Sequence, residues 1–328
     1  MIQGDKNPIA KQFIMDFCLQ TMKELNSLEV HMGVKVEQFE KKRGVFRLED
    51  VNFELPEGYI LGVVGRNGSG KSTLFQSLLF GDCLDGGTIS INGKRGGTDG
   101  EARTDYRRQC AFVLEDFPFT DTVTAKDIGD IYGPLYKDFN KEKYQELLAQ
   151  LEIPTKKRIK KLSTGMKLKV QLAFALSYDS KVLFLDEPTA SLDSFARKDL
   201  YRLIGEYMES GKRSIIWTTH LTEELDRMAD YLLILEKGKQ VLFEEKETLM
   251  SRYRVVKGGK HQLDCMKSRL IGRLDRESYS EALVKTEDGP FPFADKVEEP
   301  TIEDLLCYLN GQKKSVSEYA NIQRGMGA

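Results

Sequence analysis

The chain has 328 residues, in which 49 Lys and Arg oppose 51 Asp and Glu, so its formal net charge is −2 at pH 7. This near balance gives no electrostatic basis for binding nucleic acid, because domains that bind nucleic acid are usually clearly basic. No stretch approaches about 18 consecutive apolar residues, and the N-terminus lacks the features of a secretory signal, so we expect a cytoplasmic chain. The five cysteines are scattered without paired spacing, which predicts free thiols.

The first part of the chain predicts an extension followed by a small antiparallel sheet. Residues 1–32 form an N-terminal extension with helix-like apolar spacing, and its function cannot be inferred from the sequence. Apolar and polar residues then alternate from Val34 to Phe39 and from Val45 to Leu55, as they do in strands with one buried face. A further strand signal at Ile89 to Ile91 enters an Asn-Gly turn.

A phosphate-binding loop lies inside this region and fits the pattern G-x-x-x-x-G-K-[ST]. Its residues, with the one that follows, are Gly65, Arg66, Asn67, Gly68, Ser69, Gly70, Lys71, Ser72 and Thr73. An apolar run, Tyr59 to Val64, precedes the loop as a buried strand would, and a helix that ends at Gly81 follows it. In such a loop the backbone N–H groups surround phosphate, Lys71 reaches the β- and γ-phosphates, and Ser72 ligates Mg²⁺. The sequence therefore predicts a nucleotide hydrolase.

Two further signals lie at the end of a helical insertion predicted at about residues 116–165 and in the segment after it. The apolar run from Val182 ends in Asp186 and Glu187, at the strand end where α/β folds bind ligands. Alternation along a strand would direct Asp186 towards a metal and Glu187 towards an attacking water. The other signal is Ser163 with Gly165, directly before an amphipathic helix. Taken alone, the acidic pair could be an exposed strand end, and Ser163 an ordinary helix N-cap.

The rest of the chain completes the predicted organisation. A strand at Ser214 to Thr218 and a hairpin around Lys237 to Lys239 finish a core of residues 33–244. Residues 245–311 form a C-terminal accessory region in which Thr301 and Asp304 predict a capping box, and residues 312–328 form a mobile tail. The predicted fold class is α/β, with a P-loop ATPase core on a parallel sheet, a small antiparallel β subdomain, a helical insertion and the C-terminal accessory region.

The order of the motifs resembles the ATP-binding subunit of an ABC transporter, over about Val34 to Glu244. The motifs are the loop from Gly65, then Leu162 to Met166, Asp186-Glu187-Pro188, Ser191-Leu192-Asp193, and Thr218-Thr219-His220. The resemblance implies roles that we write as expectations. Lys71 and Ser72 would hold phosphate and Mg²⁺, Asp186 the metal, Glu187 the attacking water and His220 the γ-phosphate. Asp193 would lie at a subunit interface, and Ser163 with Gly165 would bind the γ-phosphate held by the opposite subunit of an ATP-dependent homodimer.

The chain departs from the family pattern in four places. Thr164 and Met166 replace a Gly and a Gln of the usual signature Leu-Ser-Gly-Gly-Gln. Glu115 replaces a Gln after the strand that enters the insertion, and we expect this carboxylate to act on Mg²⁺ or its water. The expected adenine-stacking aromatic is replaced by Arg43, so that Arg43, Phe39 and Phe46 remain candidates. Finally, the insertion is short, as in subunits of small ABC-2 or exporter-type systems.

We therefore expect a subunit that hydrolyses ATP, lies on the inner face of the cell membrane and drives export through a separate multi-span permease. We expect docking near Glu115 to Tyr136, through exposed residues such as Asp121 and Tyr132. The alternative is an ABC-type ATPase acting on a ribosome or nucleic acid. A small-molecule kinase would leave Ser163 and His220 unexplained, and a GTPase would need an Asn-Lys-x-Asp motif that the chain lacks.

Overall fold

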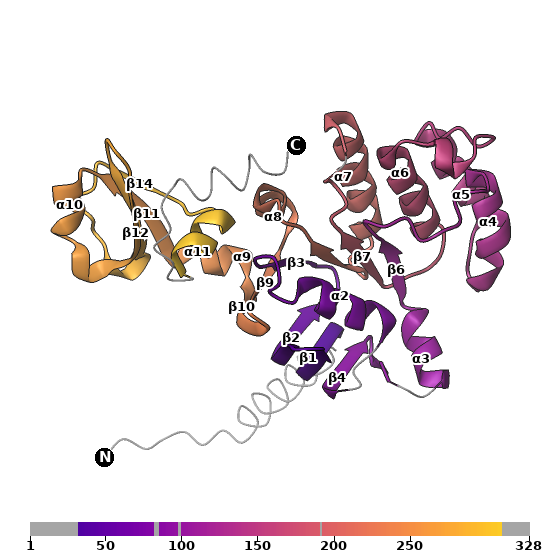
Figure 1. The fold of residues 1–328 in the computed structure, drawn as a ribbon, viewed down its shortest axis with the longest axis horizontal. Coiled ribbons are helices and arrows are strands. Elements are labelled where there is room, and N and C mark those ends of the chain that lie inside the picture. The colour runs from indigo at the N-terminus through magenta and orange to yellow at the C-terminus, as the bar shows by residue number, and fades with distance from the viewer. Residues whose placement is uncertain (1–31, 82–84, 98–99, 191, 310–328) are drawn as a thin grey trace, which may run out of the picture.

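The structure is a computed structural model that describes residues 32–81, 85–97, 100–190 and 192–309 (Figure 1). The predicted N-terminal helix pattern, the tail from residue 312, and Ser191 of the fourth motif lie outside these ranges. Within them, no helix combines the length and the apolar character needed to cross a membrane. Among the described residues, Cys110 and Cys265 are free thiols, as predicted.

The described strands of the core form one sheet in the order β5-β4-β1-β2-β10-β9-β3-β8-β7-β6. Their bounds are β1 Met32–Arg43, β2 Phe46–Pro56, β3 Ile60–Val64, β4 Gly86–Ile91, β5 Lys94–Arg95, β6 Cys110–Val113, β7 Val182–Asp186, β8 Ser214–Thr218, β9 Tyr231–Glu236 and β10 Lys239–Glu245. The segment β9-β3-β8-β7-β6 is parallel throughout. Strands β3 and β8 are buried along their whole length, as expected for a parallel sheet covered on both faces. The predicted parallel core is confirmed.

Helices cover the parallel strands. They are α2 Lys71–Phe80, α6 Thr164–Ala175, α7 Ser194–Met208 and α8 Thr222–Met228. Helix α2 packs on β7 and β8, α6 on β6, and α8 on β3. Helix α2 ends at Gly81, whose φ of 67° closes the helix in the left-handed region, as the sequence predicted.

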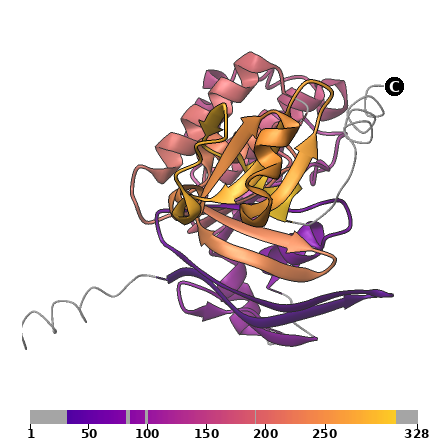
Figure 2. The same ribbon diagram turned by 90° about the vertical axis from the view of Figure 1, so that its left-hand side faces the viewer.

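The antiparallel subdomain is also confirmed. Strands β1 and β2 form a long antiparallel pair, and β4 with β5 extends it beyond β1 (Figure 2). The subdomain joins the parallel core where β10 lies beside β2, with Lys239 opposite Glu49. Strands β10 and β9 lie between this pair and β3, the strand that leads into the phosphate loop.

The helical insertion is less helical than predicted. It contains α4 Ala125–Tyr132, the 3₁₀ turn η1 Gly133–Leu135, α5 Lys141–Gln150 and the 3₁₀ turn η2 Ile159–Lys161, joined by loops. An aromatic core centred on Phe174 of α6 holds these segments, with the rings of Phe119, Tyr136 and Phe139 at 5.0, 5.3 and 5.1 Å from it. An additional helix, α3 Gly100–Arg107, precedes β6 and was not predicted.

The C-terminal region, predicted as an accessory region, contains a second sheet. Its strands follow the order β12-β13-β11-β14, and all of its strand pairs are antiparallel. The elements are α9 Lys246–Ser251, β11 Tyr253–Gly258, α10 Lys260–Asp264, η3 Lys267–Arg269, β12 Leu270–Asp275, β13 Ser280–Lys285, η4 Thr286–Asp288, β14 Lys296–Glu298 and α11 Ile302–Leu309. The predicted capping box is confirmed, because Asp304 N donates to Thr301 Oγ1 at 3.1 Å and Thr301 N to Asp304 Oδ2 at 2.8 Å.

Helix α8 connects this region to the core. The backbone N–H of Ile302, at the start of α11, donates to Asp226 Oδ1 of α8 at 3.0 Å. Lys246 Nζ donates to the Asp226 carbonyl oxygen at 2.8 Å, near the end of the same helix. The buried side chains of Leu249, Ile302 and Leu305 belong to the hydrophobic cluster that contains Leu225 of α8. The second sheet and the parallel core therefore share hydrophobic packing around α8 (Figure 1).

Candidate functional site

The chain segments that carry the predicted site residues leave the sheet at one edge. Strands β3, β8, β7 and β6 are parallel neighbours, with Val63 opposite Thr218, Asp186 opposite Thr218, and Val113 opposite Leu185. The segments after their carboxyl ends therefore lie side by side. These segments hold the phosphate loop, His220, the Asp186-Glu187 pair and Glu115, so the topology groups residues that are far apart in the sequence.

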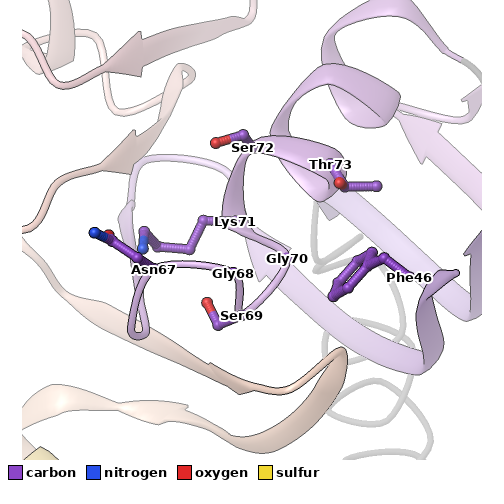
Figure 3. A pocket seen from close by; sticks show the side chains of 8 residues that line it. All are labelled: Phe46, Asn67, Gly68, Ser69, Gly70, Lys71, Ser72 and Thr73. Carbon is purple, nitrogen blue, oxygen red and sulfur yellow. The ribbon is translucent and has the colours of Figure 1, made fainter. Parts of the chain in front are cut away.

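The phosphate loop encloses a pocket of about 300 Å³ at the start of α2 (Figure 3). The pocket is lined by Phe46, Asn67, Gly68, Ser69, Gly70, Lys71, Ser72 and Thr73. Gly70 has φ 114°, and a Cβ there would lie 2.8 Å from Leu48 Cδ1 and 3.1 Å from Phe46 Cζ. Only glycine allows both this conformation and the close approach of Phe46.

A turn of the neighbouring hairpin supports the loop. Gly238, between β9 and β10, donates its N–H to the Ser69 carbonyl oxygen at 3.0 Å. Its φ is 81°, and a Cβ at this position would lie 1.8 Å from the Arg47 carbonyl oxygen. Gly238 therefore allows β2, the hairpin turn and the phosphate loop to pack against one another.

Lys71 lies within this loop, close to the acidic residues of β7. Its Nζ donates to the carbonyl oxygen of Gly65 at 2.6 Å and contacts that of Arg66 at 3.4 Å. Burial lowers the pKa of Lys71, whereas the carboxylates of Glu187 and Asp186 raise it. Both carboxylates therefore act electrostatically on the ammonium group of Lys71.

Asp186 and Glu187 have separate environments, but strand alternation is not the cause, because β7 ends at Asp186. Asp186 ends β7, and its Oδ1 accepts a hydrogen bond from Thr218 Oγ1 at 2.5 Å. Glu187 has left the strand: its φ is 46°, in the left-handed region that residues with a side chain rarely adopt. Its N–H donates to the Thr218 carbonyl oxygen at 2.9 Å, which holds this conformation next to β8.

Glu187 and His220 form a direct pair. Glu187 Oε2 lies 2.8 Å from His220 Nδ1 and accepts from the His220 backbone N–H at 3.2 Å. The side chain of Glu187 is 16% exposed and that of His220 is 47% exposed, so the pair lies at the surface of the site. Because the contact uses Nδ1, the Nε2 nitrogen of His220 remains available to a ligand.

The structure separates the three candidates for adenine stacking. Phe39 is fully buried in the antiparallel subdomain, so its candidacy was wrong. Arg43 donates through Nη2 to Gln76 Oε1 of α2 at 2.7 Å. Phe46 alone of the three lines the loop pocket, where its ring lies beside Gly70 (Figure 3).

Glu115 is exposed directly after β6, and a buried glutamine that we did not predict holds the residue before it. Gln171 Oε1 accepts from the Leu114 N–H at 2.9 Å, and Gln171 Nε2 donates to the Leu114 carbonyl oxygen at 3.0 Å. Gln171 belongs to α6, the helix that begins after Ser163. A polar residue between Val170 and Leu172 was the available signal, since buried amides usually find partners.

Ser163, Gly165 and Asp193 are not brought to the loop of their own chain. Ser163 caps α6 by accepting from the Met166 N–H at 3.3 Å, and Asp193 caps α7 by accepting from the N–H groups of Phe195 and Ala196 at 3.0 and 2.9 Å. Among the described residues, no hydrogen bond or ion pair joins these three residues to the loop. The N-cap interpretation of Ser163 therefore holds within one chain, and a role in nucleotide binding would need a second chain.

Comparison with known proteins gives consistent matches. The sequence model of the family described as ABC transporter matches residues 48–190. The chain is 30% identical over 209 residues to the ABC transporter ATP-binding protein YtrB of Bacillus subtilis (strain 168), which covers 63% of this chain and 69% of that protein. It is also 30% identical over 265 residues to the Nod factor export ATP-binding protein I of Rhizobium sp. (strain N33), covering 79% of each chain.

Solved structures support the same fold. An ATP-binding subunit of an ABC transporter has a TM-score of 0.60 and 25% identity, covering 66% of this chain and 91% of that one. A dimeric ATP-binding cassette bound to ADP and Pi has a TM-score of 0.58 and 23% identity, covering 65% of this chain and 98% of that one. The sequence matches extend through the loop, the acidic pair and the strands that position them. The chain therefore belongs to the ABC transporter family, as an ATP-binding ATPase subunit.

Proposed function

We propose that two copies of the chain close on Mg²⁺ATP and that the resulting hydrolysis drives export through separate membrane-spanning permease subunits. The observation that carries this proposal is the convergence of the Lys71 loop, Asp186 and the Glu187–His220 pair at one edge of the sheet. We propose export as the direction of transport because of the similarity to Nod factor export ATP-binding proteins and because the helical insertion is short. In this proposal residues 33–244 are the cassette and residues 245–311 are an accessory region.

The loop fits a nucleotide triphosphate. The Ser69 hydroxyl is buried and has no hydrogen-bond partner among the described residues, so it offers a polar atom inside the phosphate cradle. The loop also precedes the N-terminus of α2, whose first N–H groups attract anions. We propose that Gly65, Arg66, Asn67, Gly68, Ser69, Gly70, Lys71, Ser72 and Thr73 bind the phosphates.

The same edge of the sheet fits Mg²⁺. The described residues contain no cluster of three or more His, Cys, Asp or Glu side chains that would hold a metal alone. Mg²⁺ is usually held by one or two carboxylates together with substrate phosphates, which agrees with Ser72 and Asp186 as ligands and Glu115 nearby. When bound, the ion neutralises charge on the phosphates.

The chain's own residues divide the remaining work. Glu187 takes the proton of the attacking water, and its contact with His220 Nδ1 orients it for that role. His220 presents Nε2 to the γ-phosphate. Ser163 and Gly165 of the second copy complete the site, with Asp193 at the interface between the copies. Catalysis then depends mainly on positioning and electrostatics, as in other phosphoryl transfers.

Phe46 is our proposed adenine-stacking residue. We expect Phe46→Ala to weaken ATP binding by about 10-fold, because stacking of a base on an aromatic ring contributes about 1–3 kcal/mol. Titration with a fluorescent ATP analogue measures the effect, and Phe46→Tyr should restore affinity. Phe80→Ala, which removes an exposed ring at the far end of α2, is the matched control. Equal affinities for the two alanine variants would exclude Phe46 from the base site.

Glu115 should affect the metal requirement more than ATP affinity. We expect Glu115→Ala to raise the Mg²⁺ concentration for half-maximal hydrolysis by about 10-fold, since groups next to a metal typically change its affinity to this extent. Glu115→Gln should have a smaller effect, because the amide oxygen still reaches the metal or its water. Asp116→Ala removes the adjacent exposed carboxylate and serves as the control. An unchanged Mg²⁺ titration for Glu115→Ala would remove this residue from the site.

The permease partner needs a docking surface, and the insertion offers one. Ile131 and Leu135, on α4 and η1, are 51% and 76% exposed. Asp121 is exposed as predicted, whereas Tyr132 is partly buried, with its ring 4.9 Å from that of Phe119. The expectation of Tyr132 as an exposed contact was therefore wrong, and the two aliphatic residues replace it in our proposal.

The test of the transport function uses these residues. We expect the chain to co-purify from membranes with a multi-span protein that stimulates its ATPase rate in lipid. Ile131→Asp with Leu135→Asp should abolish that stimulation and leave ATP binding intact. Val297→Asp, at an exposed apolar position on β14, is the control. Recovery with ribosomes or DNA at physiological salt, with hydrolysis stimulated by nucleic acid, would overturn the transport assignment and leave the ATPase assignment standing.

A further inference from the structure

A carboxylate outside the known motifs lies buried behind the Glu187–His220 pair. Glu224, in the first turn of α8, is 5% exposed, although glutamate is seldom fully buried without a partner. Thr189 Oγ1 donates to Glu224 Oε2, and Thr189 itself is fully buried. Glu224 Oε1 has no hydrogen-bond partner among the described residues. A buried carboxylate held in this way needs an explanation beyond helix capping.

The Thr189–Glu224 contact joins the two segments that carry the catalytic pair. Thr189 lies two residues after Glu187, and Glu224 lies four residues after His220. The segments are thus connected twice, by Glu187 and His220 at the exposed side and by Thr189 and Glu224 at the buried side. A left-handed backbone such as that of Glu187 persists only while surrounding contacts hold it, and the Thr189–Glu224 contact lies two residues away.

We propose, on the basis of the ATPase function proposed above, that Glu224 is a positioning residue for hydrolysis: through Thr189 it holds Glu187 and His220 in the geometry that activates water. It touches neither nucleotide nor water. Its effect should therefore appear in the rate of the chemical step and not in ATP affinity, because the loop that binds the phosphates belongs to other segments.

The charges around Glu224 agree with this role. Burial raises the pKa of Glu224, and Glu187 raises it further, whereas the Thr189 hydrogen bond and the charges of Arg197 and His220 lower it. Burial also raises the pKa of Tyr201, a residue of α7, and Glu224 raises that pKa further. The electrostatic effects on Glu224 thus include both Glu187 and His220.

Four single substitutions at Glu224 and Thr189 distinguish a role in positioning Glu187 and His220 from a role in folding. Glu224→Ala and Thr189→Val remove the contact, and we expect each to lower kcat by about 10- to 100-fold, as small displacements of catalytic groups do. ATP affinity should not change comparably. Glu224→Gln and Thr189→Ser keep an acceptor and a donor, so both should retain most of the activity. The Ala and Val changes together should be no slower than the slower of the two alone, because they remove the same contact. Glu223→Ala, at an exposed neighbour, is the control.

The second readout does not need hydrolysis. The chain has only three histidines, so the imidazole signals of His220 can be assigned by NMR, with His220→Gln identifying them. These signals should shift in Glu224→Ala and Thr189→Val and stay unchanged in Glu223→Ala. Unshifted His220 signals, a folded Glu224→Ala with the kcat of Glu223→Ala, or Glu224→Gln as slow as Glu224→Ala would each overturn the proposal.

The outcomes also distinguish this inference from the function on which it rests. A wild-type chain that binds ATP but never hydrolyses it, alone or with its partner, would refute the proposed function, and the His220 spectra would still decide whether Glu224 positions the pair. If Glu224→Ala does not fold, Thr189→Val provides the test, because valine preserves the shape of the threonine and removes only the hydroxyl donor.

Discussion

Replacing Glu187 by Gln should reduce the rate of ATP hydrolysis by about 10²- to 10⁴-fold, the usual contribution of a positioned general base. In the structure, Glu187 Oε2 accepts a hydrogen bond from the His220 backbone N–H at 3.2 Å. The amide oxygen of Gln can accept the same hydrogen bond, so the geometry of the pair should survive. What is lost is the basicity that draws the proton from water. ATP binding should persist, and hydrolysis assays with the purified chain, or with its permease complex, measure the difference.

The same variant tests the shared site. Because Ser163 and Gly165 do not contact the loop of their own chain, a completed site needs a second copy, and slow hydrolysis should allow the ATP-bound dimer to accumulate. Light scattering at saturating Mg²⁺ATP should then report twice the monomer mass. A variant that binds ATP yet stays monomeric would count against the two-chain arrangement, and undiminished hydrolysis would remove Glu187 as the base.

Lys71→Ala should have the largest effect on nucleotide binding. A charge-assisted hydrogen bond to phosphate contributes about 1.5–3 kcal/mol, so we expect ATP affinity to fall by about 10- to 100-fold, and hydrolysis with it. Lys71→Arg should not restore binding, because the guanidinium fork is larger than the ammonium group and would have to fit the narrow loop in which Lys71 contacts Gly65.

Isothermal titration with ATP and with ADP measures this prediction. The loss should be larger for ATP, since Lys71 is expected to reach the γ-phosphate as well as the β-phosphate. Lys94→Ala removes an exposed lysine from β5 and serves as the control for net charge. If Lys71→Ala matched Lys94→Ala in affinity for both nucleotides, the pocket at the start of α2 would not be the phosphate site.

Local patterns were sufficient for the phosphate loop and for the strands around it. The loop needs a strand before it, glycines within it and a helix after it. All three lie in one short, continuous stretch of sequence, so they can be recognised without knowledge of the tertiary structure. Glu187 and His220 were each selected from the order of the motifs, but the contact between them was not predicted. That contact depends on the register of β7 against β8, which pairs Asp186 with Thr218 and which spacing alone does not fix.

The residues that the sequence did not resolve depend on packing between distant segments. Phe39 and Phe46 both lie in alternating strands, but an irregularity in β1 with Gln38 at φ 47° shifts the alternation and turns Phe39 into the core. In β13 the polar residues Ser280 and Glu281 are buried, with Glu281 paired to Arg276 at 2.7 Å, so the strand lacks a clear apolar pattern. Glu224 resembles an ordinary acidic residue in a first helical turn, and its burial and its contact with Thr189 are visible only in the structure.

The attachment of the C-terminal sheet to α8 sets where hybrid proteins can be joined. Asp226 of α8 accepts a hydrogen bond from the Ile302 backbone N–H through its side chain and another from Lys246 Nζ through its carbonyl oxygen. The C-terminal region and this helix therefore have matched surfaces. A chimera cut after Glu245 would combine one relative's α8 with another's α11 and bring mismatched surfaces together. A junction placed before α8 would keep that surface from one parent, but it would divide the contact between Thr189 and Glu224. A transfer of the C-terminal sheet of this chain to another protein therefore has to carry β7, the segment after it and α8 as well.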